Sequence, residues 1–165
     1  KTADSRVVTL SSIAHRNGKI QFDNLNAEQK YSKMGAYGQS KLACLMFAYE
    51  LQRRIDASGS KVLSLAAHPG VSNTNLGQHM SKWLVAIAMP LFSFFIHSPE
   101  KAALPSLYAA LGTDVKGGEY FGPTVYNEMK GKPGKVQSKP HEAAKEVAKQ
   151  LWAVSEKLTG EKFSL

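Results

Sequence analysis

YGQSK, residues 37–41, stands at the start of a helical pattern that continues to about residue 57. In a helix, Tyr37 and Lys41 are one turn apart and lie on the same face, so a phenol and an ammonium group can contact one bound molecule. A cation held beside a phenol favours the phenolate, which suits the phenol to proton transfer near neutral pH. The spacing therefore predicts a proton-transfer site. The alternative is an ordinary amphipathic residue at position 37 with a solvated neighbour at position 41.

A strand is predicted upstream of this helix. Residues 7–10 form a short apolar run rich in β-branched side chains, which is typical of a strand buried on both faces of a parallel sheet. The run ends at Ser11 and Ser12, and ligands of open α/β sheets bind outside the carboxyl ends of the strands. We therefore expect Ser12 to hydrogen-bond the substrate oxygen that gains or loses charge. Local turn contacts are the alternative, and they suit Ser11 better than Ser12.

Between the strand and the helix, residues 13–35 lack sustained periodicity and contain turn signals, which predicts a loop over the site. We expect His15 and Tyr31 in this loop to pack or to form hydrogen bonds rather than to act as catalysts. The helix itself, residues 36–57, is apolar nearly all round, which predicts burial on more than one side. One side is expected to face the sheet, and a homodimer partner is one candidate to cover another.

A second buried strand is predicted at residues 62–67, which makes the intervening helix the crossover of a β-α-β unit. His68, Pro69 and Gly70 follow it directly. A proline and a glycine at this place end the strand sharply and let the backbone approach a ligand closely. The sequence therefore predicts a second ligand-facing turn at the same edge of the sheet.

The most apolar stretch, residues 83–96, has fourteen residues and contains Pro90. It is shorter than the roughly 20 residues that span a bilayer, and the proline interrupts a helix, so we do not expect a transmembrane segment. A core helix and shallow attachment to a membrane surface are both open alternatives for it. Beyond it we expect a helix from Ser98 to Gly112, a strand at 118–123, a basic mobile connection at 124–139 and a last helix at 141–158.

Composition limits the function classes. The 165 residues are 43% hydrophobic and 21% charged, which is ordinary for a globular domain, and the formal net charge is +8. Much of the positive excess lies in the segment at 124–139 without aromatic residues between the lysines, so we expect a solvated loop and no nucleic-acid partner. The single cysteine, Cys44, excludes an intramolecular disulfide and favours a reducing, cytoplasmic compartment. No Cys/His cluster has metal-ligand spacing, so no metal is expected.

Five features occur together in the order of a known family. They are Ser12, Tyr37 twenty-five positions later, Lys41, the turn at 68–70 and Thr74. This arrangement resembles the C-terminal half of a short-chain dehydrogenase/reductase (SDR). The amino-acid sequences of residues 7–15 and 40–43 resemble those of the retinol dehydrogenase and protochlorophyllide reductase branch. The resemblance runs from the first residue to about residue 158.

The resemblance implies an α/β fold, the C-terminal part of a Rossmann-type doubly wound parallel sheet in three α/β/α layers. Residues 1–165 would form the C-terminal portion of a single domain, with an apolar substrate lid at 83–98. The sequence contains neither a Gly-x-Gly-x-x-Gly turn nor the family's upstream catalytic Asn, so we expect a longer parent chain. The segment before residue 7 is not expected to be a signal peptide.

The resemblance also implies a function: hydride transfer between NAD(P) and a lipophilic alcohol or its aldehyde or ketone. Tyr37 would pass the proton, Lys41 would bind the ribose hydroxyls, and Ser12 would hold the substrate oxygen. NADP is favoured over NAD by this branch. The cofactor-binding residues would be Tyr37, Lys41, Pro69, Gly70, Val71 and Thr74, although Thr74 or Asn73 could instead serve as a helix N-cap.

The alternative function is a catalytically silent, SDR-like protein that senses a cofactor or binds a partner. The complete set of Ser12, Tyr37 and Lys41 argues against it. The apolar composition of the lid indicates a lipophilic substrate and leaves peripheral membrane contact as an open expectation.

Overall fold

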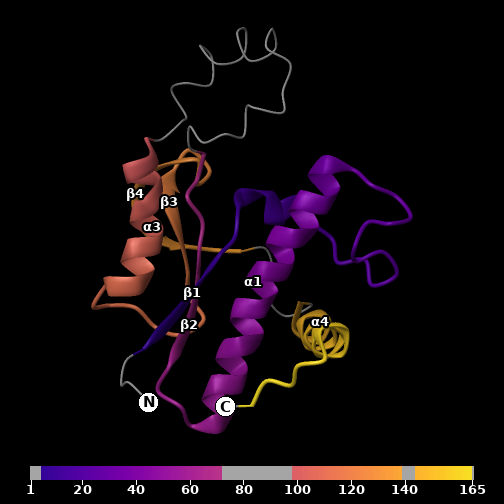
Figure 1. The fold of residues 1–165 in the computed structure, drawn as a ribbon. Coiled ribbons are helices and arrows are strands. Elements are labelled where there is room, and N and C mark those ends of the chain that lie inside the picture. The colour runs from indigo at the N-terminus through magenta and orange to yellow at the C-terminus, as the bar shows by residue number, and fades with distance from the viewer. Residues whose placement is uncertain (1–4, 72–97, 139–143, 165) are drawn as a thin grey trace, which may run out of the picture.

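The computed structural model describes residues 5–71, 98–138 and 144–164 (Figure 1). The expected lid at 83–98, apart from Ser98, and Thr74 lie outside these residues. In chain order the elements are β1 (Arg6–Leu10), the 3-10 helix η1 (Ile13–Asn17), α1 (Lys33–Ser58), β2 (Leu63–Ala67), α3 (Pro99–Leu111), β3 (Tyr120–Val125), β4 (Lys130–Val136) and α4 (Ala144–Thr159).

The four strands form one sheet in the order β1-β2-β3-β4. β1 pairs with β2 and β2 with β3 in parallel, while β3 and β4 are antiparallel. The strands predicted at 62–67 and 118–123 are therefore confirmed, with small shifts of their ends. The α/β class is also confirmed, with three parallel strands and one antiparallel strand at the edge.

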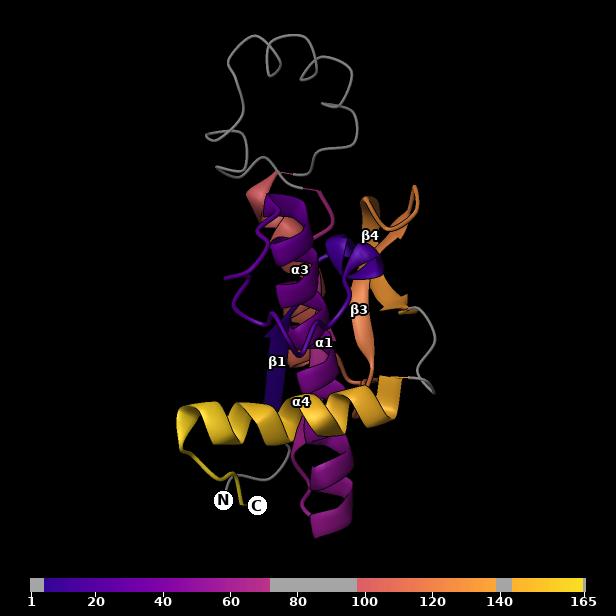
Figure 2. The same cartoon turned by 90° about the vertical axis from the view of Figure 1, so that its right-hand side faces the viewer.

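Helices cover both faces of the sheet (Figures 1 and 2). On one face, Leu65 and Ala67 of β2 pack with Phe121 of β3 and Ala109 of α3. On the other face, residues of α1 pack against Ala66 and Tyr120, because successive side chains of a strand point to opposite sides. This alternation gives the three α/β/α layers that the sequence predicts.

The longest helix, α1, begins at Lys33, three residues before the predicted start. The hydroxyl of Ser32 accepts a hydrogen bond from the amide of Gly35 and caps this end, while Gly59 ends the helix with φ of 70°. Burial on two sides is confirmed: α4 lies across the side of α1 that faces away from the sheet (Figure 2). Its Trp152 packs with Leu51 and Ile55 of α1. The homodimer contact through this helix stays a prediction.

Two expectations about strands are wrong. β1 is not buried on both faces, because Val7 is 40% and Leu10 is 53% exposed. Among the described residues, β1 pairs with no strand other than β2. This edge position leaves part of the surface of β1 uncovered. Residues 130–136 are not a mobile connection but form β4, whose Pro133 lies opposite Pro123. Pro133 is tolerated because β4 is an edge strand, and Pro123 lies beyond the part of β3 that pairs with β2, which ends at Phe121.

The remaining helices agree with the sequence more closely. α3 follows Ser98 with a proline in its first turn, as predicted, and ends before Gly112. α4 extends to Thr159, and Gly160 follows with φ of 74°. None of the helices in the part of the chain that the structure describes has the length and apolar character needed to cross a bilayer. Cytoplasmic localisation stays a prediction.

Phe121 tests the packing of α3 on the sheet, because its fully buried ring fills the space between β2, β3 and α3. We expect Phe121→Ala to lower the free energy of unfolding by about 3–5 kcal/mol, through lost burial and the cavity left behind. Urea denaturation followed by circular dichroism measures it. The control is Leu111→Ala on a residue that is 76% exposed, expected to change stability by less than about 0.5 kcal/mol. Equal losses in both variants would contradict this account of the core.

Candidate active site

Hydrogen bonds join the carboxyl end of β1 to β2 and to α1. The amide of Ser11 donates to the carbonyl of Ala67 at 2.8 Å, and its hydroxyl donates to the carbonyl of Lys41 at 2.8 Å. The expectation of local turn contacts for Ser11 is therefore wrong: its buried hydroxyl joins β1 to α1 across 30 positions of sequence. This bond fixes the end of the strand beside the turn of α1 that carries Lys41.

Ser12 begins η1. Its hydroxyl accepts a hydrogen bond from the amide of Ala14 at 3.2 Å and caps this short helix. The half-buried hydroxyl can still donate its proton to a bound oxygen, because a hydroxyl has one donor and two acceptor positions. Local turn contact and substrate binding are thus compatible at Ser12.

Two glycines bring η1 and α1 into contact. A Cβ atom on Gly18 would overlap the carbonyl of Gly38, and one on Gly38 would lie 3.1 Å from the carbonyl oxygen of Ala14. Only the absence of these side chains lets the two backbones approach so closely. The segment that carries Ser12 therefore lies directly against the helical turn that carries Tyr37.

Tyr37 and Lys41 lie on one face of α1, as the spacing predicts. The Nζ atom of Lys41 is 6.0 Å from the centre of the Tyr37 ring. Both side chains are half-buried, and among the described residues neither the phenol oxygen nor the ammonium group has a hydrogen-bond or ion-pair partner. Two polar tips held together without protein partners are suited to a ligand that carries hydroxyl groups.

The turn after β2 lies beside the turn after β1, because Leu10 and Ala67 are partners in the register of the two strands. Gly70 has φ of 74°, and an added Cβ would lie 2.6 Å from the carbonyl oxygen of Met129. The amide of Val71 donates to that same oxygen at 3.1 Å. Pro69, Gly70 and Val71 are half-buried at this edge of the sheet.

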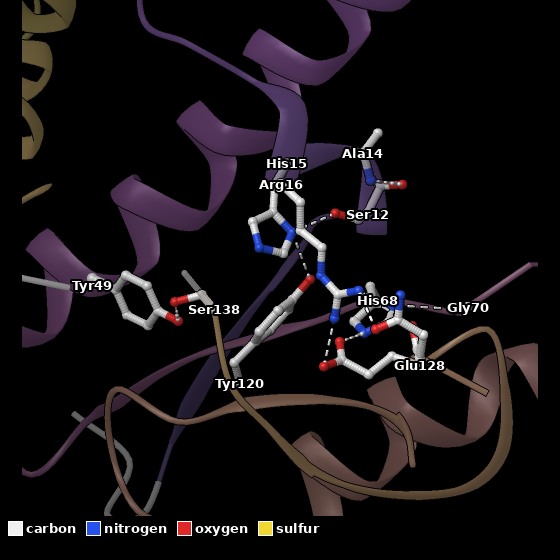
Figure 3. A network of polar contacts seen from close by, with 11 residues as sticks. Ser12, Ala14, His15, Arg16, Tyr49, His68, Gly70, Tyr120, Glu128 and Ser138 are labelled. Carbon is white, nitrogen blue, oxygen red and sulfur yellow. Dashed lines mark hydrogen bonds and ion pairs between the residues drawn. The ribbon is translucent and has the colours of Figure 1, made fainter. Parts of the chain in front are cut away.

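A network of polar side chains lies behind these turns (Figure 3). His15 places Nδ1 2.6 Å from the carbonyl oxygen of Ser12, which confirms the expectation that it forms a hydrogen bond. The ring of Tyr120 lies between two imidazoles, with centres 5.5 Å from His15 and 5.1 Å from His68. Tyr31, in contrast, is exposed, so the expectation that it packs is wrong.

Comparison with known proteins was made by sequence and by structure. No family model matches the chain. It is 40% identical to human retinol dehydrogenase 13 over 96% of this chain and 47% of that protein. Identity is 37% to mouse retinol dehydrogenase 14, over 96% of this chain and 46% of that protein, and 35% to human polyprenol dehydrogenase, over 94% and 45%. A crystal structure of an uncharacterized protein from Mycobacterium paratuberculosis matches with a TM-score of 0.76 and 38% identity, over 98% of this chain and 53% of that one.

The chain belongs to the short-chain dehydrogenase/reductase family. Its relatives place it in the retinol dehydrogenase-like branch, which confirms the resemblance drawn from the sequence. The structural match also confirms the Rossmann-like C-terminal part. The chain spans about half the length of the curated relatives it matches.

Sequence reasoning missed Glu128 of this SDR chain. Its carboxylate bridges Arg16 of η1, with Nη2 to Oε1 2.6 Å, and His68, with Nε2 to Oε2 3.1 Å. One signal was present: Glu128 is the only acidic residue in the basic segment at 124–139. Assigning that segment to a solvated loop hid the acid that points into the structure.

Both buried imidazoles are neutral at neutral pH. Burial, and to a lesser extent the nearby His15 and Arg16, lower the pKa of His68 to about 3. Burial also lowers the pKa of His15. The contact between His68 and Glu128 is therefore a hydrogen bond to a carboxylate and not an ion pair. Because the amide of Gly70 donates to Nδ1 at 3.2 Å, the proton of His68 belongs on Nε2.

These buried histidines predict how stability depends on pH. The pKa of His68 is 6.5 in the unfolded chain and about 3 when folded, so the unfolded state binds more protons within this window. Stability is present above pH 6.5 and falls on acidification, by about 1.4 kcal/mol per pH unit for each histidine that stays neutral. The raised pKa of Glu128 acts in the opposite direction from about pH 4.5 upward, so the effect of His68 is isolated by comparing the wild-type protein with a His68 variant between pH 7 and about 5.

Urea denaturation at several pH values checks this slope. Replacing His68 with Asn should remove about one proton from the difference in protons bound by the unfolded and folded states below pH 6.5. The slope of the free energy of unfolding against pH should therefore decrease, and the part due to His15 should remain. A slope that stays the same in His68→Asn would show that His68 is not held neutral.

Proposed function

We propose that this chain carries the chemical part of an NAD(P)-dependent oxidoreductase that interconverts a lipophilic alcohol and its aldehyde or ketone. The observation that supports this proposal most is the contact between the segment that carries Ser12 and the face of α1 that carries Tyr37 and Lys41. Among the described residues, the phenol oxygen and the ammonium group on that face have no hydrogen-bond or ion-pair partner. Relatives named retinol and polyprenol dehydrogenases support an alcohol with a long apolar body.

A nicotinamide cofactor fits the residues at this edge of the sheet. The ammonium group of Lys41 can donate to ribose hydroxyls, and the turn formed by Pro69, Gly70 and Val71 offers backbone groups beside it. Thr74 belongs to this proposal as a further contact. When bound, the cofactor supplies or accepts the hydride. We propose NADP as the preferred form, on the resemblance to this branch.

The chain's own residues handle the proton and the developing charge. The hydroxyl of Ser12 donates a hydrogen bond to the substrate oxygen, which stabilises negative charge there. Tyr37 transfers the proton between that oxygen and solvent, and the ammonium group of Lys41 lies 6.0 Å from the centre of its ring. The apolar stretch at 83–96 is proposed to surround the rest of the substrate and to exclude water.

Replacing Tyr37 with Phe tests the proposal, because it removes only the hydroxyl and keeps a ring under Lys41. We expect kcat to fall by about 10²–10⁴-fold, the usual contribution of a positioned acid or base. Affinity for NADPH should change less than about threefold, since Lys41 and the 69–71 turn remain. Reduction of retinal and long-chain aldehydes by the full-length protein, with NADPH and NADH compared, provides the measurement.

The matched control is Tyr108→Phe. Tyr108 lies on α3, where its hydroxyl contacts Asp114 at 2.9 Å, and it is not part of the candidate site. Removal of the Tyr108 hydroxyl should leave kcat unchanged. Near-normal turnover in Tyr37→Phe would overturn the proton-transfer role. A wild-type protein that binds NADPH but reduces no aldehyde or ketone would favour the catalytically silent alternative.

A further inference from the structure

The connection between β3 and β4 has an unusual backbone. Tyr126, Asn127 and Glu128 follow one another with φ of 51°, 56° and 66°. L-residues with side chains rarely adopt this left-handed region, and three in succession are costly. Among the described residues, Ala27 is the only other non-glycine residue with positive φ. Such a conformation persists only where its surroundings hold it in place.

Arg16 supplies that support from η1. One guanidinium nitrogen, Nη1, donates to the side-chain oxygen of Asn127 at 3.0 Å and to its carbonyl at 3.3 Å. The other, Nη2, lies 2.6 Å from Oε1 of Glu128. Both partners of this ion pair are largely buried, with side chains 18% and 17% exposed. A planar, forked donor can hold two successive residues in one geometry, which a lysine could not do.

The strained connection in turn holds the turn after β2. The carbonyl of Met129 accepts from the amide of Val71 at 3.1 Å. Glu128 contacts Nε2 of His68 at 3.1 Å, and Nδ1 of the same imidazole accepts from the amide of Gly70 at 3.2 Å. The backbone amides of both Gly70 and Val71 are therefore fixed by residues 128 and 129, one directly and one through His68.

Charge decides how His68 performs this task. An ionised Glu128 can only accept hydrogen bonds, so the neutral imidazole must present its N–H at Nε2. Nδ1 then carries the lone pair that Gly70 needs. If the other tautomer formed, an N–H would face the N–H of Gly70 and the turn would lose its support. The surrounding charged or titratable groups are Arg16 and His15 from η1 and Tyr120 from β3.

We propose that Arg16 and Glu128 are positioning residues: through the tautomer of His68 they set the Pro69–Val71 turn relative to Ser12. Arg16 belongs to the short helix that Ser12 begins, so one chain of contacts joins the substrate side of the site to its cofactor side. The structural part is independent of the activity. Its consequence for catalysis rests on the proposed function, which places this turn against the nicotinamide.

The first test needs no substitution. In the full-length protein, nitrogen chemical shifts of the His68 imidazole between pH 6 and 7.5 should show a neutral ring with its proton on Nε2. An Nδ1-protonated or charged ring would overturn the proposal. This measurement requires neither cofactor nor turnover.

The second test is Glu128→Gln, which keeps the size of the side chain but can donate as well as accept. We expect a mixture of His68 tautomers and hydrogen exchange of the Gly70 and Val71 amides that is at least about tenfold faster. Exchange in the β1–β2 ladder should not change. Arg16→Lys should act in the same direction, and it serves as the second variant if Glu128→Gln does not fold.

The matched control is Glu119→Gln. Glu119 has a similar exposure, 22%, and its own ion pair with Lys135 at 2.9 Å, but it lies directly before β3 and has no contact with His68. It should leave the tautomer, the amide exchange and the kinetics as they are. Unchanged exchange in both Glu128→Gln and Arg16→Lys, or equal effects in Glu119→Gln, would overturn the proposal.

Kinetics test the catalytic consequence. Misplacement of a reacting group by about 1 Å can cost 10²-fold in rate, so Glu128→Gln should lower kcat about 10- to 100-fold. KM for the lipophilic substrate should change less than about threefold, because the apolar contacts remain. Faster amide exchange with normal kcat would refute the catalytic part. An inactive wild-type protein whose His68 carries the Nε2 proton would refute the proposed function and leave the structural part in place.

Discussion

The close contact of η1 with α1 is the constraint on which the candidate site depends. Gly18 and Gly38 have no side chains, so the two backbones meet directly, and the hydroxyl of Ser11 adds a bond to the carbonyl of Lys41. Without this contact Ser12 would stand on a free loop. With it, the hydroxyl is carried by an element fixed to the same helix as Tyr37. The site therefore needs little rearrangement, which is how rigid elements position reacting groups.

Much of this arrangement follows from local patterns in the sequence. The strands at 7–10 and 62–67 and the long helix could be predicted because apolar runs and helical periodicity depend on neighbouring residues. The same-face placement of Tyr37 and Lys41 follows from the pitch of a helix. The bounds of the helix from Ser98 to Gly112 also follow from local signals, a serine before a proline at its start and a glycine after its end.

What the sequence did not show depends on distant partners. β4 contains glycine, proline and lysine, a composition typical of a loop, and it becomes a strand only by pairing with β3. The contact of His68 with Glu128 joins residues 60 positions apart, and that of Arg16 with Asn127 joins residues 111 apart. No local pattern records such pairs, and the left-handed turn at 126–128 has no glycine to announce it. Tertiary contacts select these conformations against local preference.

The position of β4 also gives a role to the positive charge of the chain. Lys130, Lys132 and Lys135 are spread along the outermost strand among the described residues, together with Pro133. Unpaired strand edges invite pairing with other molecules, and lysine and proline are the residues that natural sheets use to discourage it. Mutual repulsion of these ammonium groups would oppose fibril growth along this border. Part of the positive charge of the protein therefore lies where it discourages edge-to-edge association of the sheet.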